Sequence, residues 1–297
     1  MRLGTRRSAL ALAQAELVAR ALGGCELVPI ATGGDHGAPA SDKSRWVAEL
    51  EQALLAEQID LAVHSAKDLP VELPDGLELL GAPERSAPED VLCGVGALEQ
   101  LAPGARVGTS SIRRVAQLRA AREDLEVAQL RGNVDTRLAK LSDAGQRLDA
   151  IVLARAGLRR LAREESAGTS LDPAVFVPAP GQGTLALEGR AGDAHMEQAA
   201  REITHGPTLS ALLAERELAR ELGADCHTPL GAWARPEDER ELRLRAWVGL
   251  PDGSAWVRDE LVGEAADGPE LARELARRLR TAGAAELLAR AQEMAGV

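Results

Sequence analysis

Residues 60–70 read Asp-Leu-Ala-Val-His-Ser-Ala-Lys-Asp-Leu-Pro, so an apolar run passes directly into a polar turn. The apolar run predicts a strand, and in open α/β sheets ligands bind just beyond the carboxyl ends of strands. Because a neighbouring positive charge favours the ionised carboxylate, we expect Lys67 to keep Asp68 ionised. Such a carboxylate in a cleft can stabilise a developing cation or accept a proton, whereas in a surface turn it is merely solvated.

Strands and helices alternate on both sides of this stretch, which predicts parallel or mixed sheets covered on both faces. The predicted strands are residues 2–5, 26–32, 60–63, 77–80, 91–95, 106–109, 126–130, 150–153 and 184–187. The predicted helices are residues 8–22, 44–58, 111–122, 134–144 and 154–163. The stretches 3–8 and 107–112 both read as a strand, Gly-Thr, a polar turn and a helix start, which indicates either two similar lobes or a chance likeness.

The last third of the chain has a different pattern. A helix over 208–222 and a strand over 230–234 precede two strands, 242–250 and 255–262, that flank a Pro-Asp-Gly-Ser turn. We therefore expect an α/β protein with a small α+β C-terminal domain built on an antiparallel sheet. The predicted domains are 1–83 with 184–201, then 89–177, then 206–297.

Composition limits the partners of this 297-residue chain. Its net charge of −11 argues against general binding of nucleic acid or anionic membranes. Cys25, Cys93 and Cys226 are too widely spaced for a zinc site, and an odd, sparse set is typical of a reducing compartment. No signal-peptide core and no apolar segment of about 18 residues occurs, so we expect a cytoplasmic protein with no membrane partner and no metal.

Two strand ends in the middle of the chain predict an anion site. Residues 108–114, Gly-Thr-Ser-Ser-Ile-Arg-Arg, place hydroxyl groups and free backbone N–H groups at a helix start, where an anion is favoured. Arg113 and Arg114 oppose the helix dipole there, which an anion lying between them would relieve; a capping Ser followed by two solvated arginines is the alternative. Arg131 and Arg137 repeat the pattern in the next unit.

Arg159 and Arg160 follow in the third unit, and Arg6 and Arg7 could add to the gathering from the first lobe. In an acidic protein this favours a polyanionic ligand, either a polycarboxylate or a phosphate. The sequence has no phosphate loop and no Gly-x-Gly-x-x-Gly after a strand, so nucleotide binding has little support. Cys226, in a polar loop, is either a reactive thiol or a small buried residue.

Six blocks in this order closely resemble the porphobilinogen deaminase (hydroxymethylbilane synthase) family. They are residues 5–8, 62–70, 107–114, 130–134, 178–183 and the loop around Cys226. The resemblance implies two lobes like those of type II periplasmic binding proteins, and a third domain that carries a dipyrromethane cofactor as a thioether on Cys226. It also implies condensation of four porphobilinogen units, with loss of ammonia, to hydroxymethylbilane.

Site roles follow from the resemblance residue by residue. Asp68 and Lys67 are the implied catalytic residues, with Asp68 stabilising an azafulvenium-like cation and Lys67 either keeping it ionised or binding a substrate carboxylate. The implied cofactor contacts are Cys226, Ser8, Ser65, Lys67, Asp68, Thr109, Ser110, Ser111, Arg113, Arg114, Arg131 and Gly132. The implied substrate contacts are Arg6, Arg137, Arg160, Gln182, Trp46 and Lys43.

The chain departs from the family pattern near residues 41–46, where Lys43 and Trp46 stand in for the usual lysine and aromatic residue. The resemblance further implies a monomer that passes its product transiently to uroporphyrinogen-III synthase. Two other functions compete with this one. A polycarboxylate-binding protein without catalysis would use the same lobes, but it does not need Cys226. A sugar-phosphate or phosphoryl-transfer enzyme would use the arginines, but this sequence has neither a phosphate loop nor a set of metal ligands.

Overall fold

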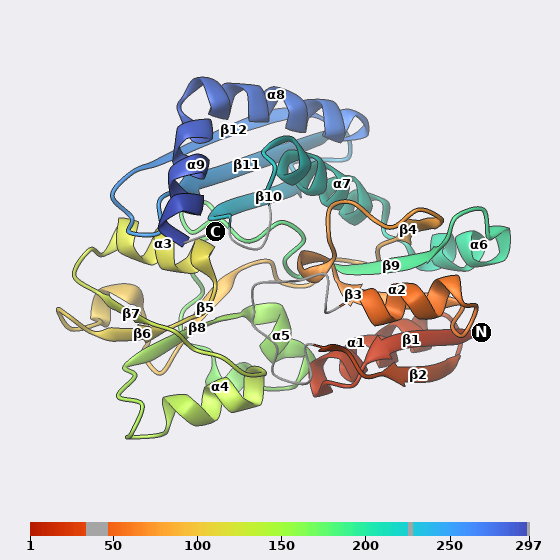
Figure 1. The fold of residues 1–297 in the computed structure, drawn as a ribbon, viewed down its shortest axis with the longest axis horizontal. Coiled ribbons are helices and arrows are strands. Elements are labelled where there is room, and N and C mark those ends of the chain that lie inside the picture. Colours follow the sequence, from red (N-terminus) through yellow and green to blue (C-terminus); the bar gives the residue numbers. More distant parts are fainter. Residues whose placement is uncertain (34–46, 225–227, 296–297) are drawn as a thin grey trace.

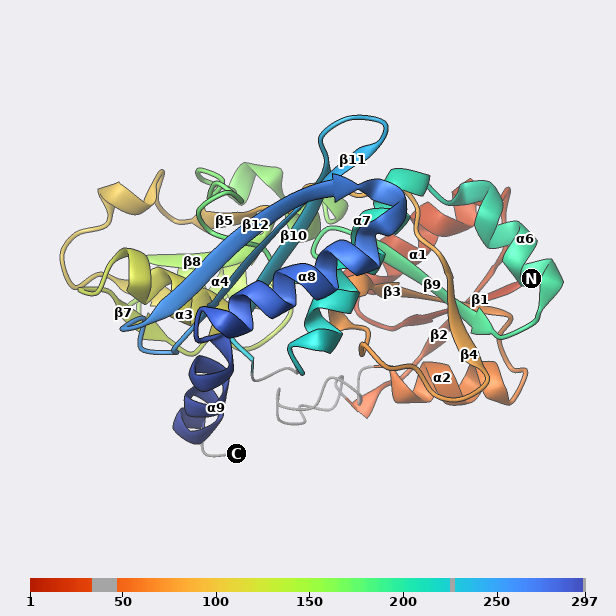
Figure 2. The same cartoon turned by 90° about the horizontal axis from the view of Figure 1, so that it is seen from above.

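Two α/β lobes lie side by side in the computed structural model, and a C-terminal α+β domain lies across both of them (Figure 1). The structure describes residues 1–33, 47–224 and 228–295. Seen from above, helix α8 (Gly268–Thr281) runs along the sheet of its own domain (Figure 2).

The first lobe is a five-stranded sheet with strand order β2-β1-β3-β9-β4, in which β9 runs antiparallel to its neighbours. Its strands are β1 (Arg2–Arg6), β2 (Glu26–Ile30), β3 (Leu61–Ser65), β4 (Leu77–Gly81) and β9 (Leu185–Arg190). Its helices are α1 (Ala9–Ala21), α2 (Ala48–Leu55) and α6 (Ala194–Ile203). Leu61 and Val63 of β3 pack in one core cluster and Ala62 in another, so helices cover both faces of the sheet.

The second lobe is a four-stranded sheet with strand order β5-β8-β6-β7. Its strands are β5 (Asp90–Cys93), β6 (Arg106–Gly108), β7 (Glu126–Ala128) and β8 (Ala150–Ala154), and its helices are α3 (Ile112–Ala121), α4 (Val134–Leu141) and α5 (Arg155–Arg160). Three parallel strands followed by one antiparallel strand is also the order β2-β1-β3-β9 of the first lobe. The repeated Gly-Thr stretches at 3–8 and 107–112 lie on the equivalent strands β1 and β6, so the likeness reflects a shared lobe topology.

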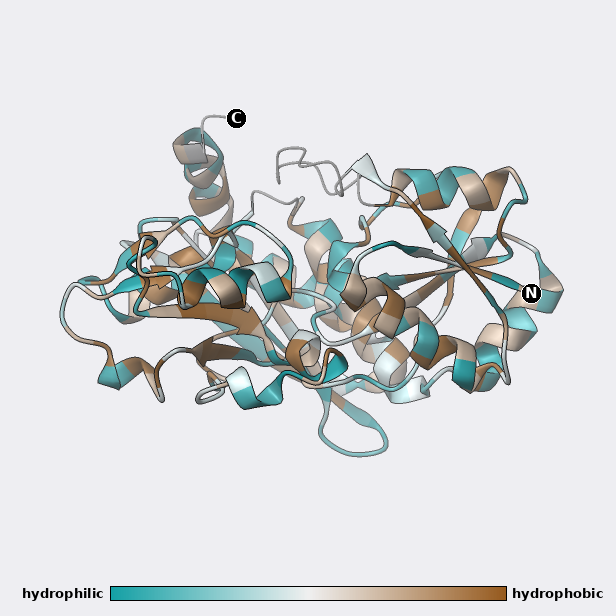
Figure 3. Cartoon of the chain, turned by 90° about the horizontal axis from the view of Figure 1, so that it is seen from below, coloured by the Kyte–Doolittle hydropathy of each residue, from teal (hydrophilic) through white to brown (hydrophobic). Residues whose placement is uncertain are grey.

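The C-terminal domain packs helices against an antiparallel sheet, β10-β11-β12. Its strands are β10 (Leu230–Pro236), β11 (Glu241–Gly249) and β12 (Trp256–Glu264), and its helices are α7 (Gly206–Glu221), α8 (Gly268–Thr281) and α9 (Ala284–Ala295). Leu218, Leu244 and Leu275 are fully buried in its core. Hydrophobic segments lie mainly along the strands in Figure 3, while most helices alternate hydrophobic and hydrophilic residues.

The structure also differs from the sequence-based expectations at several element ends. The predicted strand 91–95 stops at Cys93, because Gly94 has a positive φ of 99°, and the predicted helix 154–163 stops at Arg160, just before Ala162 with a φ of 51°. Helices α6 and α9 were not predicted. Each sheet lies within one of the three predicted domain ranges, although α6 extends past 201, and the boundaries stay predictions. None of the described helices is long and apolar enough to cross a membrane.

Candidate active site

The turn that follows β3 is held mainly by backbone contacts. After Ser65 the chain enters a single 3₁₀ turn, Ala66–Asp68, whose first N–H donates to the carbonyl of Thr184 at 3.0 Å. The Ser65 hydroxyl exchanges hydrogen bonds with the side-chain amide of Gln14 on α1. A Cβ on Gly181, which has a φ of 73°, would lie 2.9 Å from the carbonyl carbon of Ala66, so glycine is required under this turn.

The two lobes bring charges of both signs to this turn. Burial lowers the pKa of Lys67 to about 8, the charge of Asp68 opposes that effect, and the charge of Arg114 adds to it. Burial also lowers the pKa of Arg137 to about 10, with Arg114 adding to the effect and Asp68 opposing it. Asp68 of the first lobe is therefore close enough to Arg137 of the second lobe for their charges to interact.

Arg113 and Arg114, in the first turn of α3, are buried and have an anion of the protein itself as their partner. Asp90, fully buried at the start of β5, accepts from Arg113 Nη2 at 2.7 Å and from Arg114 Nη2 at 2.7 Å. The second connection between the lobes runs from the end of α5 at Arg160 to the start of β9 at Leu185. Gln182 in this connection is fully buried and donates to the same carboxylate at 2.9 Å. Burial alone would raise the pKa of Asp90, but the charges of Arg113 and Arg114 outweigh it and hold that pKa below its usual range.

Further hydrogen bonds tie Arg113 Nη1 to the carbonyl of Val177 at 2.7 Å and Arg114 Nη1 to that of Val152 at 3.0 Å. Among the described residues, the buried Arg113 Nε has no hydrogen-bond partner. The sequence left open a bound anion between these two arginines or two solvated arginines; instead, both are buried and share the carboxylate of Asp90. Its only sequence signal was an acidic residue at the start of an apolar strand.

The hydroxyl groups predicted for the site lie at the carboxyl ends of parallel strands. Ser8 follows β1 and caps α1 by accepting from the N–H of Ala11 at 3.3 Å. Thr109 is buried, and its hydroxyl accepts from the N–H of Ser111, while Ser110 donates to the carbonyl of Leu130. Ser111 begins α3 without a capping hydrogen bond from its side chain.

The remaining predicted arginines differ in exposure. Arg131 and Gly132 are exposed after β7, and Arg137 Nε donates to the carbonyl of Gly132 at 2.7 Å. Arg6, at the end of β1, lies 3.4 Å from the hydroxyl of Thr32. Burial lowers the pKa of Arg160 to about 10, and its guanidinium donates to the carbonyl of Gly183 at 2.7 Å.

Arg159 points elsewhere and pairs with Glu164 on the surface. Arg159 and Arg160 also line a hollow of about 450 Å³ between α1, α5 and the connection at 83–86. Three predicted residues, Lys43, Trp46 and Cys226, lie outside the described residues.

A dipyrromethane with its carboxylate side chains fits the groups that are present. Lys67 and Arg137 supply positive charge beside Asp68. The hydroxyl of Ser111 and the free N–H groups at the start of α3 supply hydrogen-bond donors, and the buried Arg113 Nε supplies another. Carboxylates bind well to such a set of cationic and neutral donors.

Comparison with known proteins places the whole chain in one family. The pattern described as "Porphobilinogen deaminase, dipyromethane cofactor binding domain" matches residues 1–198, and that described as "Porphobilinogen deaminase, C-terminal domain" matches residues 209–281. The porphobilinogen deaminase of Thermus thermophilus is 45% identical over 295 residues, covering 97% of each chain. That of Desulforudis audaxviator is 47% identical over 302 residues, covering 97% of this chain and 96% of its own.

Among solved structures, a periplasmic substrate-binding protein of an ABC transporter from Coxiella burnetii is similar, with 14% identity and a TM-score of 0.43. That match covers 70% of this chain and 93% of the other chain, and it is too distant to bear on function. The matches to the deaminase sequences extend over both lobes and the C-terminal domain. The chain therefore belongs to the porphobilinogen deaminase family.

Proposed function

We propose that this chain is a transferase of tetrapyrrole biosynthesis. It joins four porphobilinogen units head to tail to a covalent dipyrromethane primer on Cys226, with loss of four ammonia molecules. Hydrolysis by one water then releases hydroxymethylbilane and leaves the primer on the protein. Family membership over nearly the whole chain supports this activity. The observation that carries the assignment of the site is the Asp68 carboxylate, whose charge acts on Lys67 beside it and on Arg137 of the opposite lobe.

Asp68 is the residue that we assign to the bond-breaking step. Loss of ammonia from an aminomethylpyrrole breaks a C–N bond and leaves an electron-poor azafulvenium carbon. A carboxylate held beside that carbon stabilises positive charge that is larger in the transition state than in the substrate. Lys67 would keep this carboxylate ionised or bind a substrate carboxylate, and burial lowers the pKa of Lys67 to about 8.

The cationic and hydroxyl groups would bind carboxylates. Each porphobilinogen unit carries an acetate and a propionate, so the ligand gains negative charge as the product grows. Substrate contacts are proposed for Arg6, Arg137, Arg160, Gln182, Trp46 and Lys43. Cofactor contacts are proposed for Ser8, Ser65, Lys67, Asp68, Thr109, Ser110, Ser111, Arg113, Arg114, Arg131 and Gly132. Arg113 and Arg114 would act while remaining bound to Asp90, through the positive charge that the pair has in excess of one carboxylate.

The dipyrromethane, when bound through Cys226, supplies the pyrrole carbon to which the first unit is joined. What the chain itself contributes is position and charge. Cys226 follows the end of α7 at Glu221 in the sequence, so the C-terminal domain would hold the primer while the lobes hold the incoming unit. The thiolate of Cys226 is the nucleophile that installs the primer.

Intact-protein mass spectrometry tests the primer. We expect the purified protein to carry an adduct with the mass of a dipyrromethane, and we expect Cys226→Ser to lack it and to be inactive. Cys25→Ser is the matched control, because Cys25 is a half-buried free cysteine of the first lobe, and this variant should keep both the adduct and the activity. An unmodified wild-type protein with full activity would refute the primer.

Substitution of the central carboxylate tests the chemistry. Asp68→Asn keeps the size of the side chain but removes its charge, so we expect kcat to fall by about 10²-fold or more, as for loss of one electrostatic stabiliser. Primer content and the binding of porphobilinogen should be retained. The control is Asp75→Asn, at an exposed carboxylate later in the same connection. Near-normal turnover of Asp68→Asn would exclude this residue from the bond-breaking step.

A monomer in the cytoplasm that hands its product to uroporphyrinogen-III synthase is also part of the proposal. The net charge of −11 supports the absence of a nucleic-acid or membrane partner, and two free cysteines support a reducing compartment. Light scattering after size exclusion measures the oligomeric state. If the product is handed over directly, a mixture with the synthase should accumulate less free hydroxymethylbilane than the separately measured rates of the two enzymes predict.

A further inference from the structure

Arg216 of α7 reaches from the C-terminal domain to the segment that follows Asp68. Its Nη2 donates to the carbonyl oxygens of Pro70 and Val71, both at 2.8 Å. The side chain of Val71 packs against the hydrophobic core of the C-terminal domain. The exit of the turn that carries Asp68 is therefore attached to that domain by a charged donor and by an apolar contact.

The entry of the same turn is fixed within the first lobe. His64 on β3 lies 2.9 Å from Glu188 Oε2 on β9, and both side chains are almost fully buried. Glu188 is also near Arg216: burial lowers the pKa of Arg216, and the charges of Glu188 and Glu72 oppose that effect. The buried carboxylate of Glu188 thus lies near both His64, at the entry of the turn, and Arg216, at its exit.

Between these two ends lie the 3₁₀ turn itself and the segment that leads to β4. Within it, the N–H of Leu69 donates to the carbonyl of Ala66 at 3.3 Å. After Leu69 the chain has no regular structure until β4 begins at Leu77. The carbonyls of Pro70 and Val71 therefore depend on a donor outside their own segment, and Arg216 supplies it.

Helix α7 is a firm base for this contact. Glu215, beside Arg216, is fully buried and accepts from Arg85 Nη1 at 2.6 Å and from the N–H groups of Gly181 and Ala234 at 2.6 and 2.7 Å. The segment with Cys226 follows the end of α7 at Glu221. A single helix thus connects the segment with Cys226 to the turn with Asp68.

We propose that Arg216 is a positioning residue: by holding the carbonyls of Pro70 and Val71, it fixes Asp68 relative to the domain that contains Cys226. The inference rests on the proposed role of Asp68 in catalysis. Misplacing a reacting group by about 1 Å can cost up to about 10²-fold in rate. Since Arg216 contacts backbone carbonyls rather than substrate, its loss should lower kcat and leave KM nearly unchanged.

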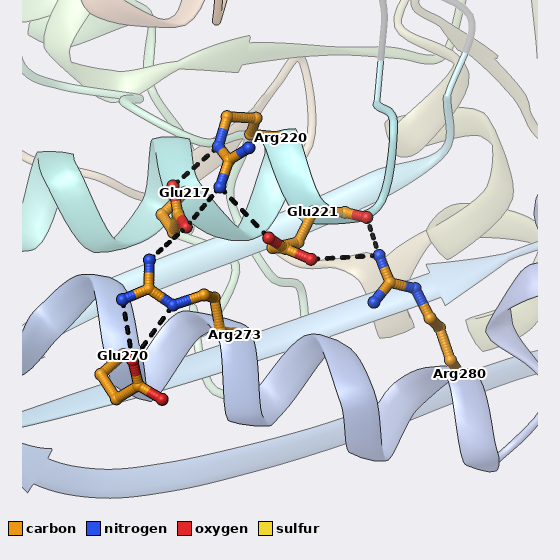
Figure 4. Close-up of polar contacts among 6 residues, drawn as sticks. All are labelled: Glu217, Arg220, Glu221, Glu270, Arg273 and Arg280. Carbon is orange, nitrogen blue, oxygen red and sulfur yellow. Dashed lines mark hydrogen bonds and ion pairs between the residues drawn. The ribbon is translucent and has the colours of Figure 1, made fainter.

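The chain offers a matched control on the same helix. Arg220 lies one turn further along α7 and donates to Glu217 at 2.7 Å, while Arg273 and Arg280 of α8 donate to Glu217 and Glu221 (Figure 4). This cluster lies at the surface between two helices of one domain. Arg220→Gln removes the same type of side chain from the same helix and leaves the hydrogen bonds to Pro70 and Val71 in place, although the charge of Arg220 also acts on Glu72.

For Arg216→Gln we expect kcat to fall by about 10- to 100-fold, with KM within about twofold of wild type. Backbone amides of residues 66–71 should exchange hydrogen faster. Arg216→Lys keeps the charge but not the guanidinium geometry, so its kcat should be intermediate, and this variant also serves if Arg216→Gln folds poorly. Arg220→Gln should match wild type in rate and exchange.

A double substitution separates positioning from a general structural effect. If Arg216 acts through Asp68, adding Arg216→Gln to Asp68→Asn should lower kcat no further, whereas independent effects would multiply. Multiplicative losses, unchanged exchange at 66–71, or a loss confined to KM would each overturn the proposal. A failure of the proposed function shows separately, as normal turnover of Asp68→Asn alone, while hydrogen exchange still reports whether Arg216 orders the turn.

Discussion

Lys67 is the residue whose environment bears most directly on how activity depends on pH. Burial disfavours its charged form and lowers its pKa to about 8, although Asp68 beside it works in the opposite direction. Below about pH 8 the side chain is therefore an ammonium ion, and above that value it becomes neutral. An ammonium that holds Asp68 ionised, or that binds a substrate carboxylate, would stop doing so within a pH range that the enzyme can be assayed in.

We expect kcat/KM of the wild type to fall as pH rises through about 8, because this parameter reports groups of the free enzyme. In Lys67→Arg the guanidinium stays charged throughout that range, so the alkaline fall should move to higher pH, even if the maximum is lower. The measurement is a pH profile of both proteins with porphobilinogen. An alkaline fall that stays at the same pH in Lys67→Arg would assign it to another group.

At the scale of elements, the start of α3 is stabilised by a strand rather than by its own capping residue. Two arginines in the first turn of a helix oppose its dipole. Asp90 at the start of β5 neutralises part of that charge and links α3 to Gln182 in the connection between the lobes. The helix, the strand and the connection therefore form one buried polar network.

Asp90→Asn should lower the free energy of unfolding by about 3–5 kcal/mol, because it leaves two buried guanidinium groups without a counter-charge. Asp124 is the control, since it forms an exposed pair with Arg122 in the same lobe, and Asp124→Asn should have a much smaller effect. Urea unfolding followed by circular dichroism measures both. Equal stabilities for the two variants would show that Asp90 does not hold α3.

At the scale of the whole molecule, the two connections between the lobes and the C-terminal domain meet at the carboxylate of Glu215. Glu215 of α7 is bound by Arg85 from the first connection between the lobes, by the N–H of Gly181 from the second connection, and by the N–H of Ala234 from β10. Burial raises the pKa of Glu215, and the charge and hydrogen bonds of Arg85 oppose that effect. The carboxylate thus couples both connections to the C-terminal domain.

Glu215→Gln should lower the free energy of unfolding by about 3–5 kcal/mol, because the largely buried Arg85 would lose its counter-ion. We also expect proteases to cut the connection at 82–89 faster than in the wild type, since both connections lose an anchor. Thermal unfolding together with limited proteolysis tests this. Wild-type stability combined with a wild-type cleavage rate would contradict a coupling role for Glu215.

Local patterns in the sequence predicted most of the secondary structure. Ser8 caps α1 as its position before an apolar helix indicated, and Pro-Asp-Gly-Ser lies in the turn between β11 and β12. The likeness between residues 3–8 and 107–112 left two similar lobes or chance open, and the strand pairing shows two similar lobes. The helix cap and the hairpin turn depend on residues a few positions apart, so neighbouring side chains suffice to specify them.

The sequence by itself determined the motifs and the family, and it left open whether an anion lies beside Arg113 and Arg114 or whether both arginines are solvated. Only the tertiary structure decided that Asp90, 24 residues before Arg114, is that anion, and that Arg85 pairs with Glu215, 130 residues away. It also decided that Arg216 reaches the turn with Asp68. Such pairs form when sheets and helices pack, and many acidic residues are available to each arginine, so no local pattern selects the partner.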